Sequence, residues 1–322
     1  MKSTDISNAQ TVGDCAYLAI EKHFQKTLNH EADVLKDTDP EELHQMRVGM
    51  RRLRSAISGF SSALKLPKAA TEEKIGKIAR QLGELRDLDV LIETLQNQYK
   101  PHLPEDEQEN IDTVLEILGK QRRKVFAKVY KTLRGKAYQK FKDALKNWLE
   151  KPIYSEVAEF PILLVLPDLL APQISRLLLH PGWLLGGNLG DFHAEPLNDA
   201  KPTTIEAQLA EKGPVLHSLR KQVKRVRYQM SLFTKLYGEN YEEYVEEMKE
   251  VQEILGTIQD SFVLEEMLGE ILDNPLENEL PNLSKKLTET RQEAWEKWQP
   301  LQQRYLTEET RKAFHLSLLN SP

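Results

Sequence analysis

The chain has a single cysteine, Cys15, and only modest amounts of glycine and proline. One cysteine excludes a disulfide framework within the chain and argues against a cysteine-based metal cluster. The first fourteen residues are polar and lack the apolar core of a secretory signal. The longest apolar stretch, 162–166, is far shorter than the roughly 20 residues that span a bilayer. These absences predict a protein of the reducing cytoplasm that has no membrane segment.

An overall positive charge is also missing. The formal net charge is -6 at pH 7 and the sequence pI is about 5.9. Any anion-binding surface must therefore be local, produced by segregation of the charges rather than by their total. Hydrophobic residues make up 40% of the chain and charged residues 29%, which is typical of a globular protein.

Against this acidic background, one basic phrase occurs twice. HQMRVGMRRLRSAISGF occupies 44–60 and HSLRKQVKRVRYQMSLF occupies 217–233, and neither contains an acid. Aligning His44 with His217 gives an offset of 173 residues. The same offset places LGELRDLDVLIETL, which starts at Leu82, on LGTIQDSFVLEEML, which starts at Leu255. We interpret this as an internal duplication, which predicts two structural halves related by a pseudo-two-fold axis.

Both halves have the sequence pattern of successive helices. Asp39, Pro40 and the two glutamates after them form a strong helix start, and Gly213-Pro214 is expected to play a similar part before His217. A further helical pattern from about 104 to 149 is expected to break near Gly135. No segment alternates with period two for long, so the fold is predicted to be all-α.

The duplication is interrupted by a proline-rich segment. We expect a first helical half over about 10–150, a connecting segment over about 151–213 and a second helical half over about 214–318. Within the connecting segment, residues 162–180 are apolar enough to pack as a short helix, and the rest is expected to be ordered loop.

Each basic phrase divides into two faces when it is drawn as a helix at about 100° per residue. In the first, Met46, Met50, Leu53, Ile57 and Phe60 form an apolar stripe opposite the cations. In the second, the apolar stripe consists of Leu219, Val223, Val226, Met230 and Phe233. The candidate binding residues on the basic sides are His44, Arg47, Arg51, Arg52, Arg54, His217, Arg220, Lys221, Lys224, Arg225 and Arg227.

A basic face without acids is unusual, because solvated helix faces commonly mix signs and gain from i,i+4 pairing. Two sources could compensate for the repulsion. Asp87 and Asp260, at matching positions, could each orient an arginine, or an external polyanion could bind. A third basic run, 120–146, contains eleven lysines or arginines and a single acid, Asp143, which favours the polyanion.

These blocks resemble the CHAD domain, the conserved-histidine α-helical domain. The resemblance rests on HQMRVGMRRLR from His44, LGELRDLDV from Leu82, HSLRKQVKRVRY from His217 and LGTIQD from Leu255, in the order of the family. It implies a single CHAD domain over about 10–318, with two four-helix halves packed around a basic central cleft or channel. It also implies binding of inorganic polyphosphate, a linear polyanion, by a module without catalytic activity. Polyphosphate granules and polyphosphate-metabolising proteins are the partners that this would entail.

Two other functions stay open. A phosphate-anhydride-processing enzyme could use His44 or His217 as a phospho-acceptor or general acid, but the sequence has no Walker loop, HExxH or nucleophile elbow. A nucleic-acid or acidic-partner binder is disfavoured, because few aromatic residues lie near the cations. We therefore assign no catalytic residue, metal or cofactor. Asp87 and Asp89 could ligate a metal, but Asp89 becomes Phe262 in the second copy, which argues against a duplicated metal site.

Two smaller expectations concern packing. The four tryptophans are expected to pack in the core or between helices rather than to contact a ligand. Arg122 and Arg291 are expected to correspond across the two halves at a slightly altered offset.

Overall fold

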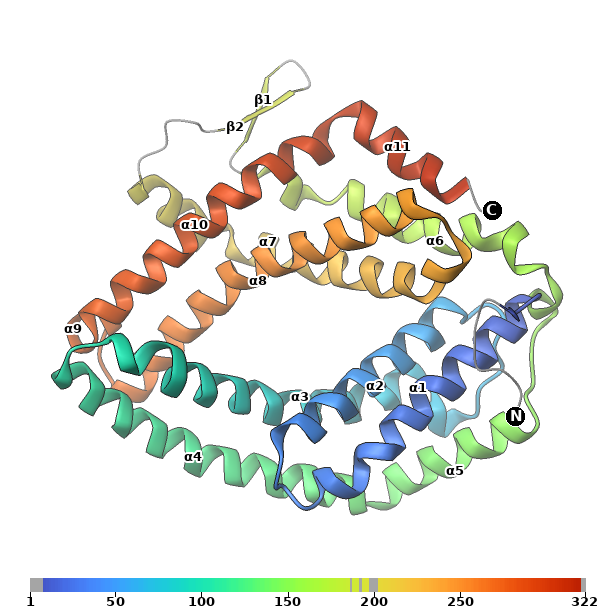
Figure 1. Cartoon of the computed structure of the whole chain (residues 1–322), viewed down its shortest axis with the longest axis horizontal. Coiled ribbons are helices and arrows are strands. Elements are labelled where there is room, and N and C mark those ends of the chain that lie inside the picture. The colour runs from blue at the N-terminus through green and yellow to red at the C-terminus, as the bar shows by residue number, and fades with distance from the viewer. Residues whose placement is uncertain (1–7, 186, 191–192, 197–201, 320–322) are drawn as a thin grey trace. The chain divides into compact units, whose positions relative to one another are not determined.

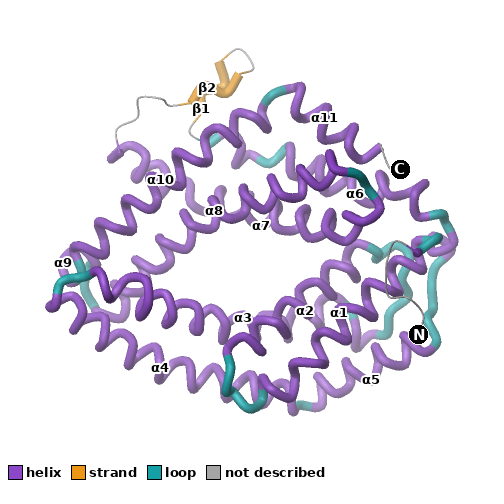
Figure 2. The backbone as a smooth tube through the Cα atoms, viewed as in Figure 1, coloured by secondary structure: helices purple, strands orange, loops and turns teal. Residues whose placement is uncertain are grey.

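Helices account for most of the structure, a computed structural model that describes residues 8–185, 187–190, 193–196 and 202–319 (Figure 2). The prediction of an all-α fold is confirmed, with one short antiparallel hairpin that pairs Gly187 with Pro196. The chain divides into two compact units: unit 1 comprises 1–102 and 111–166, and unit 2 comprises 103–110 and 167–322. These boundaries differ from the expected halves, because 103–110 belongs with the C-terminal part of the chain and unit 2 includes the chain from 167 rather than from about 214.

Unit 1 is built mainly from the helices α1 to α5 (Figure 1). Their bounds are α1 Val12–Val34, α2 Pro40–Gly59, α3 Glu72–Thr94, α4 Glu105–Arg134 and α5 Lys136–Glu150. The helix α3 is followed by a π-helical turn, Leu95–Tyr99, and by the 3₁₀ turn Lys100–His102; further 3₁₀ turns are Lys68–Ala70 and Glu156–Glu159. The expected break at Gly135 is confirmed, because α4 ends at Arg134 and α5 begins at Lys136.

Unit 2 contains the remaining helices and the hairpin (Figure 1). Their bounds are α6 Ile162–Leu178, α7 Pro202–Phe233, α8 Glu239–Leu272, α9 Leu276–Glu279, α10 Pro281–Leu306 and α11 Glu308–Leu319. The strands are β1 Gly187–Gly190 and β2 His193–Pro196, and the 3₁₀ turns are Pro181–Leu184 and Thr234–Leu236. The first turn of α6 belongs to unit 1 and its remainder to unit 2.

The helix α2 begins where the sequence predicts. Asp39 is the residue before the helix, and its carboxylate accepts a hydrogen bond of 2.8 Å from the backbone N–H of Glu41. Pro40 takes the first helical position, where a missing N–H costs nothing. The apolar stripe of α2 is buried in unit 1, and the corresponding stripe of α7 is buried in unit 2. Both basic faces are thereby turned away from the cores.

The predicted start of α7 at Gly213-Pro214 is wrong. The helix runs continuously from Pro202, with Pro214 inside it, so much of the expected loop is helical. An interior proline removes one hydrogen bond and clashes with the preceding turn. Tertiary contacts outweigh that cost, because Leu209 is buried and Glu206 forms an ion pair with Arg291 of α10.

A carboxylate from a distant segment caps α10. Glu107, in the first turn of α4, accepts hydrogen bonds from the backbone N–H groups of Asn282 and Leu283 at 2.9 and 3.2 Å, and from the side-chain amide of Asn282. These are donors that the start of a helix leaves unsatisfied, and the helix dipole adds to the attraction for a carboxylate. Only 2% of the Glu107 surface is exposed. The segment 103–110 is thus a structural part of unit 2.

The tryptophans pack in the cores, as expected. Trp183 stacks on Trp298 and on Tyr305, with ring centroids 5.2 and 5.0 Å apart. Trp148 and Trp295 are also buried.

The apolar segment around α6 is longer than the five residues counted in the sequence. Residues Ile162–Leu184 are long and apolar enough to cross a membrane by length and composition alone, and 33% of the most apolar window is buried in the structure. A buried helix of a globular core meets the same criterion, so the finding is weak evidence for a membrane segment. That the protein lacks such a segment stays a prediction.

Candidate functional site

The first basic stripe lies on α2, opposite the buried methionines. His44, Arg47 and Arg51 are half-buried, whereas Arg52 and Arg54 are exposed. The half-buried cations are therefore partly covered by neighbouring side chains, whereas the exposed ones extend into solvent. Arg54 Nε donates to Glu72 of α3 over 3.1 Å.

The guanidinium group of Arg47 lies over a glycine of the neighbouring helix α3. Its Nη2 donates to Asp87 Oδ1 of α3 over 3.2 Å. A Cβ atom added to Gly83, one turn earlier on α3, would lie 3.5 Å from Arg47 Nε, so the guanidinium lies directly over that glycine. The Asp87 side chain is 71% exposed, and ion pairs with so exposed a partner contribute at most about 1 kcal/mol. Asp87 therefore orients Arg47 without removing it from solvent.

The second basic stripe lies on α7. His217, Arg220, Lys224 and Arg227 are half-buried, and Lys221 and Arg225 are exposed. Arg227 donates to the side chain of Gln252 on α8 over 3.2 Å and lies 5.6 Å from the ring centre of Tyr228.

The contact of Arg47 recurs in the second stripe at the offset of the sequence repeat. Arg220 donates to both oxygens of Asp260 on α8, over 2.9 and 3.2 Å. It also lies over Gly256, where an added Cβ would come within 2.9 Å of Arg220 Nη2. In each unit a glycine of the next helix accommodates the guanidinium, and an aspartate one turn later on that helix accepts from it. The sequence shows the aspartate as a repeated residue, but only the structure gives the glycine this role.

The pKa values of both histidines are lowered from their ordinary range. For His44 the largest cause is burial, followed by an opposing effect of Glu41 and the positive charges of Arg86 and Arg51. For His217 the largest cause is again burial, with Lys221 and Arg220 next. Both rings are therefore neutral in the free protein at pH 7, and each sits among cations that would favour an arriving anion.

Arg86 belongs to the same basic cluster as His44, although it is not among the candidate binding residues. It is half-buried on α3, and its charge lowers the pKa of His44, which places it in the same basic cluster. The signal was its position in the LGELRDLDV block. The repeat has Gln259 at the corresponding position, so the duplication does not mark this arginine.

The expected correspondence of Arg122 and Arg291 is visible in what they contact. Arg122 Nε donates to Asp89 over 2.6 Å, and its other nitrogens donate to both oxygens of Asp37 over 2.7 Å. Arg291 lies 4.3 Å from the ring centre of Phe262, the residue that replaces Asp89 in the repeat. Each arginine therefore packs on the same position of the repeated helix, once against a carboxylate and once against a ring.

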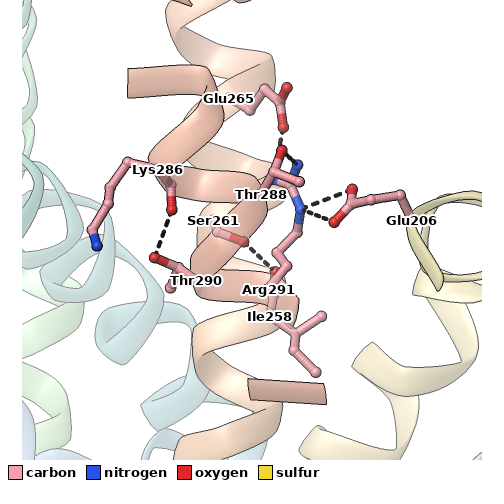
Figure 3. A network of polar contacts seen from close by, with 8 residues as sticks. All are labelled: Glu206, Ile258, Ser261, Glu265, Lys286, Thr288, Thr290 and Arg291. Carbon is pink, nitrogen blue, oxygen red and sulfur yellow. Dashed lines mark hydrogen bonds and ion pairs between the residues drawn. The ribbon is translucent and has the colours of Figure 1, made fainter. Parts of the chain in front are cut away.

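Because Phe262 replaces the aspartate in the second copy, Arg291 has other carboxylates as its partners. It donates to Glu206 of α7 over 3.0 and 3.1 Å, to Glu265 of α8 over 2.7 Å and to the hydroxyl of Thr288 over 3.1 Å (Figure 3). Its side chain is 3% exposed. This cluster ties three helices of unit 2 together, and it serves the structure rather than a ligand.

Asp89 likewise has an arginine, Arg122, as its partner. Burial raises its pKa, and Arg122 opposes that rise. Among the described residues, no group of three or more histidines, cysteines or acids could hold a metal ion. The two basic stripes lie in different units, and a cleft shared between them stays a prediction.

Comparisons with known proteins agree on one family. The model of the CHAD domain matches residues 18–269. The crystal structure of the CHAD domain from the plant Ricinus communis is similar with a TM-score of 0.60 and 20% identity, over 97% of this chain and 93% of that one. The structure of PptA from Streptomyces chartreusis has a TM-score of 0.51 and 14% identity, over 96% and 99% of the two chains. At these identities the likeness concerns the fold alone. No curated protein matches the chain.

Proposed function

The chain belongs to the CHAD domain family, and from that membership we propose that it binds inorganic polyphosphate through the basic stripes of α2 and α7. The observation that carries the proposal is the repeated arrangement of Arg47 and Arg220, each lying over a glycine and held by an exposed aspartate. Oriented guanidinium groups on two acid-free stripes suit a ligand with many equivalent negative charges. The protein acts in this proposal as a binding or targeting module without catalytic activity.

The residue types fit this ligand. Polyphosphate carries about one negative charge per phosphate and has no base edges to read, so recognition depends on many cations along a track. Arginine can bond two phosphate oxygens at once, whereas lysine adds point charge. Release of counterions from the polymer would supply much of the affinity, as it does for nucleic-acid backbones. We further propose that the protein is cytoplasmic and meets polyphosphate at granules or beside polyphosphate-metabolising proteins.

A titration with polyphosphate of defined lengths tests the proposed function. We expect saturable binding that persists in the presence of single-stranded DNA of equal charge, because the stripes offer few aromatic surfaces for bases. Incubation with polyphosphate, ATP or triphosphate and a divalent metal should release no phosphate above the background. Turnover that is lost when His44 or His217 is replaced would instead favour the enzyme, and preference for DNA would favour a nucleic-acid binder.

Binding should tighten as the pH falls from 8 to 6. In the free protein the pKa values of His44 and His217 lie below their ordinary value, so both rings are neutral. A bound polyanion raises these pKa values, so the complex takes up protons. The affinity therefore rises as the pH falls through the pKa of the bound state and levels off below that of the free state.

Titrations of long polyphosphate at several pH values measure this effect, since chain ends then contribute little to the proton balance. The control is a variant with His44→Gln and His217→Gln, whose affinity should change much less with pH. An equal pH dependence in that variant would show that the histidines do not touch the anion.

A further inference from the structure

The third basic run forms an exposed face on one side of unit 1. It is carried by α4 and α5 and lies within the part of these helices that belongs to unit 1. Between residues 120 and 146, the exposed cations are Lys120, Arg123, Lys124, Lys128, Lys131, Arg134, Lys136, Lys140 and Lys146. We call these nine residues the outer basic face. None of them belongs to the stripes of the proposed site.

Helix geometry aligns these cations. At 100° per residue, the six on α4 fall within an arc of about 140°. Val125, Val129 and Leu133 lie on the opposite side and are buried. On α5, Tyr138, Phe141 and Leu145 are buried opposite its three exposed lysines. The face extends over about 27 residues, which corresponds to roughly 40 Å of helix.

The outer basic face lacks the ion pairs that other surface helices of this chain make. Lys77, Lys249 and Lys312 each pair with an acid three or four residues away on the same helix. Across the described residues, none of the nine cations of the face is in an ion pair. Like charges at this spacing destabilise a helix, so the free protein bears an uncompensated repulsion here. An external polyanion would relieve it.

The side chains on the face indicate which polyanion fits. Seven of the nine cations are lysines, which act as point charges rather than as planar forks. Tyr130 is the one large apolar side chain between 120 and 146 that is well exposed, and Arg134 lies 5.9 Å from its ring centre. A nucleic acid would use a series of aromatic platforms, and a membrane surface would use several exposed apolar residues. A chain of phosphates needs only charge.

We infer that the outer basic face is a second polyphosphate-binding surface, separate from the stripes of α2 and α7. This inference rests on the proposed function for the identity of the ligand, but not for the location of the site. With two surfaces, one protein molecule can hold two polyphosphate chains or two parts of a long one. The protein is then a cross-linker of polyphosphate as well as a binder.

The test compares three double variants. Lys124→Glu with Lys131→Glu changes the outer basic face, Arg51→Glu with Lys224→Glu changes the stripes, and Lys68→Glu with Lys297→Glu changes two exposed cations outside both regions. All three change the net charge equally. Circular dichroism verifies that each variant is folded, which we expect because the outer-face and control residues are exposed.

With long polyphosphate, the unmodified protein should form large cross-linked complexes, measured by light scattering. The outer-face variant should lose this scattering while the affinity of its α2 and α7 stripes for short polyphosphate changes less than about threefold. The variant that combines the stripe and outer-face changes should bind long polyphosphate at least tenfold more weakly than the stripe variant alone. The Lys68, Lys297 variant should behave like the unmodified protein in both measurements.

Three results would overturn the inference. The outer-face variant could scatter as the unmodified protein does, the combined variant could bind no more weakly than the stripe variant, or the outer-face changes could reduce binding of single-stranded DNA while leaving polyphosphate unaffected. Failure of the proposed function gives a different pattern. In that case the stripe changes leave short polyphosphate binding intact, whatever the outer-face variant does.

Discussion

Reversing Arg51 and Lys224 to glutamate should weaken polyphosphate binding at least about 100-fold at low salt. Both residues are half-buried on the basic stripes, one on α2 and one on α7. A hydrogen bond to a charged group contributes about 1.5–3 kcal/mol, so two lost contacts amount to about 3–6 kcal/mol. Every 1.4 kcal/mol corresponds to a factor of ten in affinity, and each reversal also adds repulsion.

The loss should shrink as salt is raised, because the affinity of the unmodified protein is itself sensitive to salt. Titrations at two salt concentrations measure this. The variant with Lys68→Glu and Lys297→Glu carries the same change in net charge and should lose far less affinity. The stripe variant should stay folded, because the changed side chains lie opposite the buried Met50 and Val223. Unchanged affinity in a folded stripe variant would show that the repeated basic phrase is not the binding site.

Replacing Arg122 by methionine should destabilise unit 1 by about 3 kcal/mol. The side chain of Asp89 is 4% exposed and would lose its 2.6 Å partner, while Asp37 would lose both of its hydrogen bonds. Breaking a buried ion pair from one side costs about 3–5 kcal/mol, and the low end applies here because Arg122 is 22% exposed. A domain of this size loses roughly 2–4 °C of melting temperature per kcal/mol, so a fall of about 6–12 °C is expected.

The repeat supplies a matched control for this experiment. Asp89→Phe reproduces the ring that Arg291 packs against in unit 2, and Arg122 keeps its two bonds to Asp37. Replacing buried charge by well-packed apolar atoms is often nearly neutral. Thermal melts should therefore show a smaller loss for Asp89→Phe than for Arg122→Met. Equal losses in the two variants would mean that the guanidinium does not stabilise this position through its partners.

Local sequence signals predicted the parts of the fold that depend on neighbours in the chain. The cap at Asp39, the bend at Gly135 and the two faces of α2 follow from capping, helix breaking and a period of 3.6 residues. The start of α7 did not follow, since Gly213-Pro214 is a strong local signal for a helix start. The contacts that override it, such as the pair of Glu206 with Arg291, join residues 85 positions apart.

The candidate site was predictable to the extent that it is repeated. Duplication drew attention to Arg47, Arg220 and their aspartates, because the same types recur at one offset. Where the copies diverge, the repeat offers no such guidance. Arg86 is aligned with Gln259 in the second copy. The ion pair of Arg122 with Asp37 joins residues 85 positions apart, and no sequence pattern predicts it.

The cap that Glu107 provides for α10 has a consequence for how the protein is made. During synthesis, residues 103–110 leave the ribosome long before the helix start at Asn282 that they will satisfy, since 175 residues separate Glu107 from Asn282. Domains generally fold from the N-terminus as the chain emerges. The first turn of α4, which belongs to unit 2, must therefore wait with its carboxylate in water while unit 1 can already assemble. Neither unit is a continuous piece of the gene, and no single cut in the chain would release both of them whole.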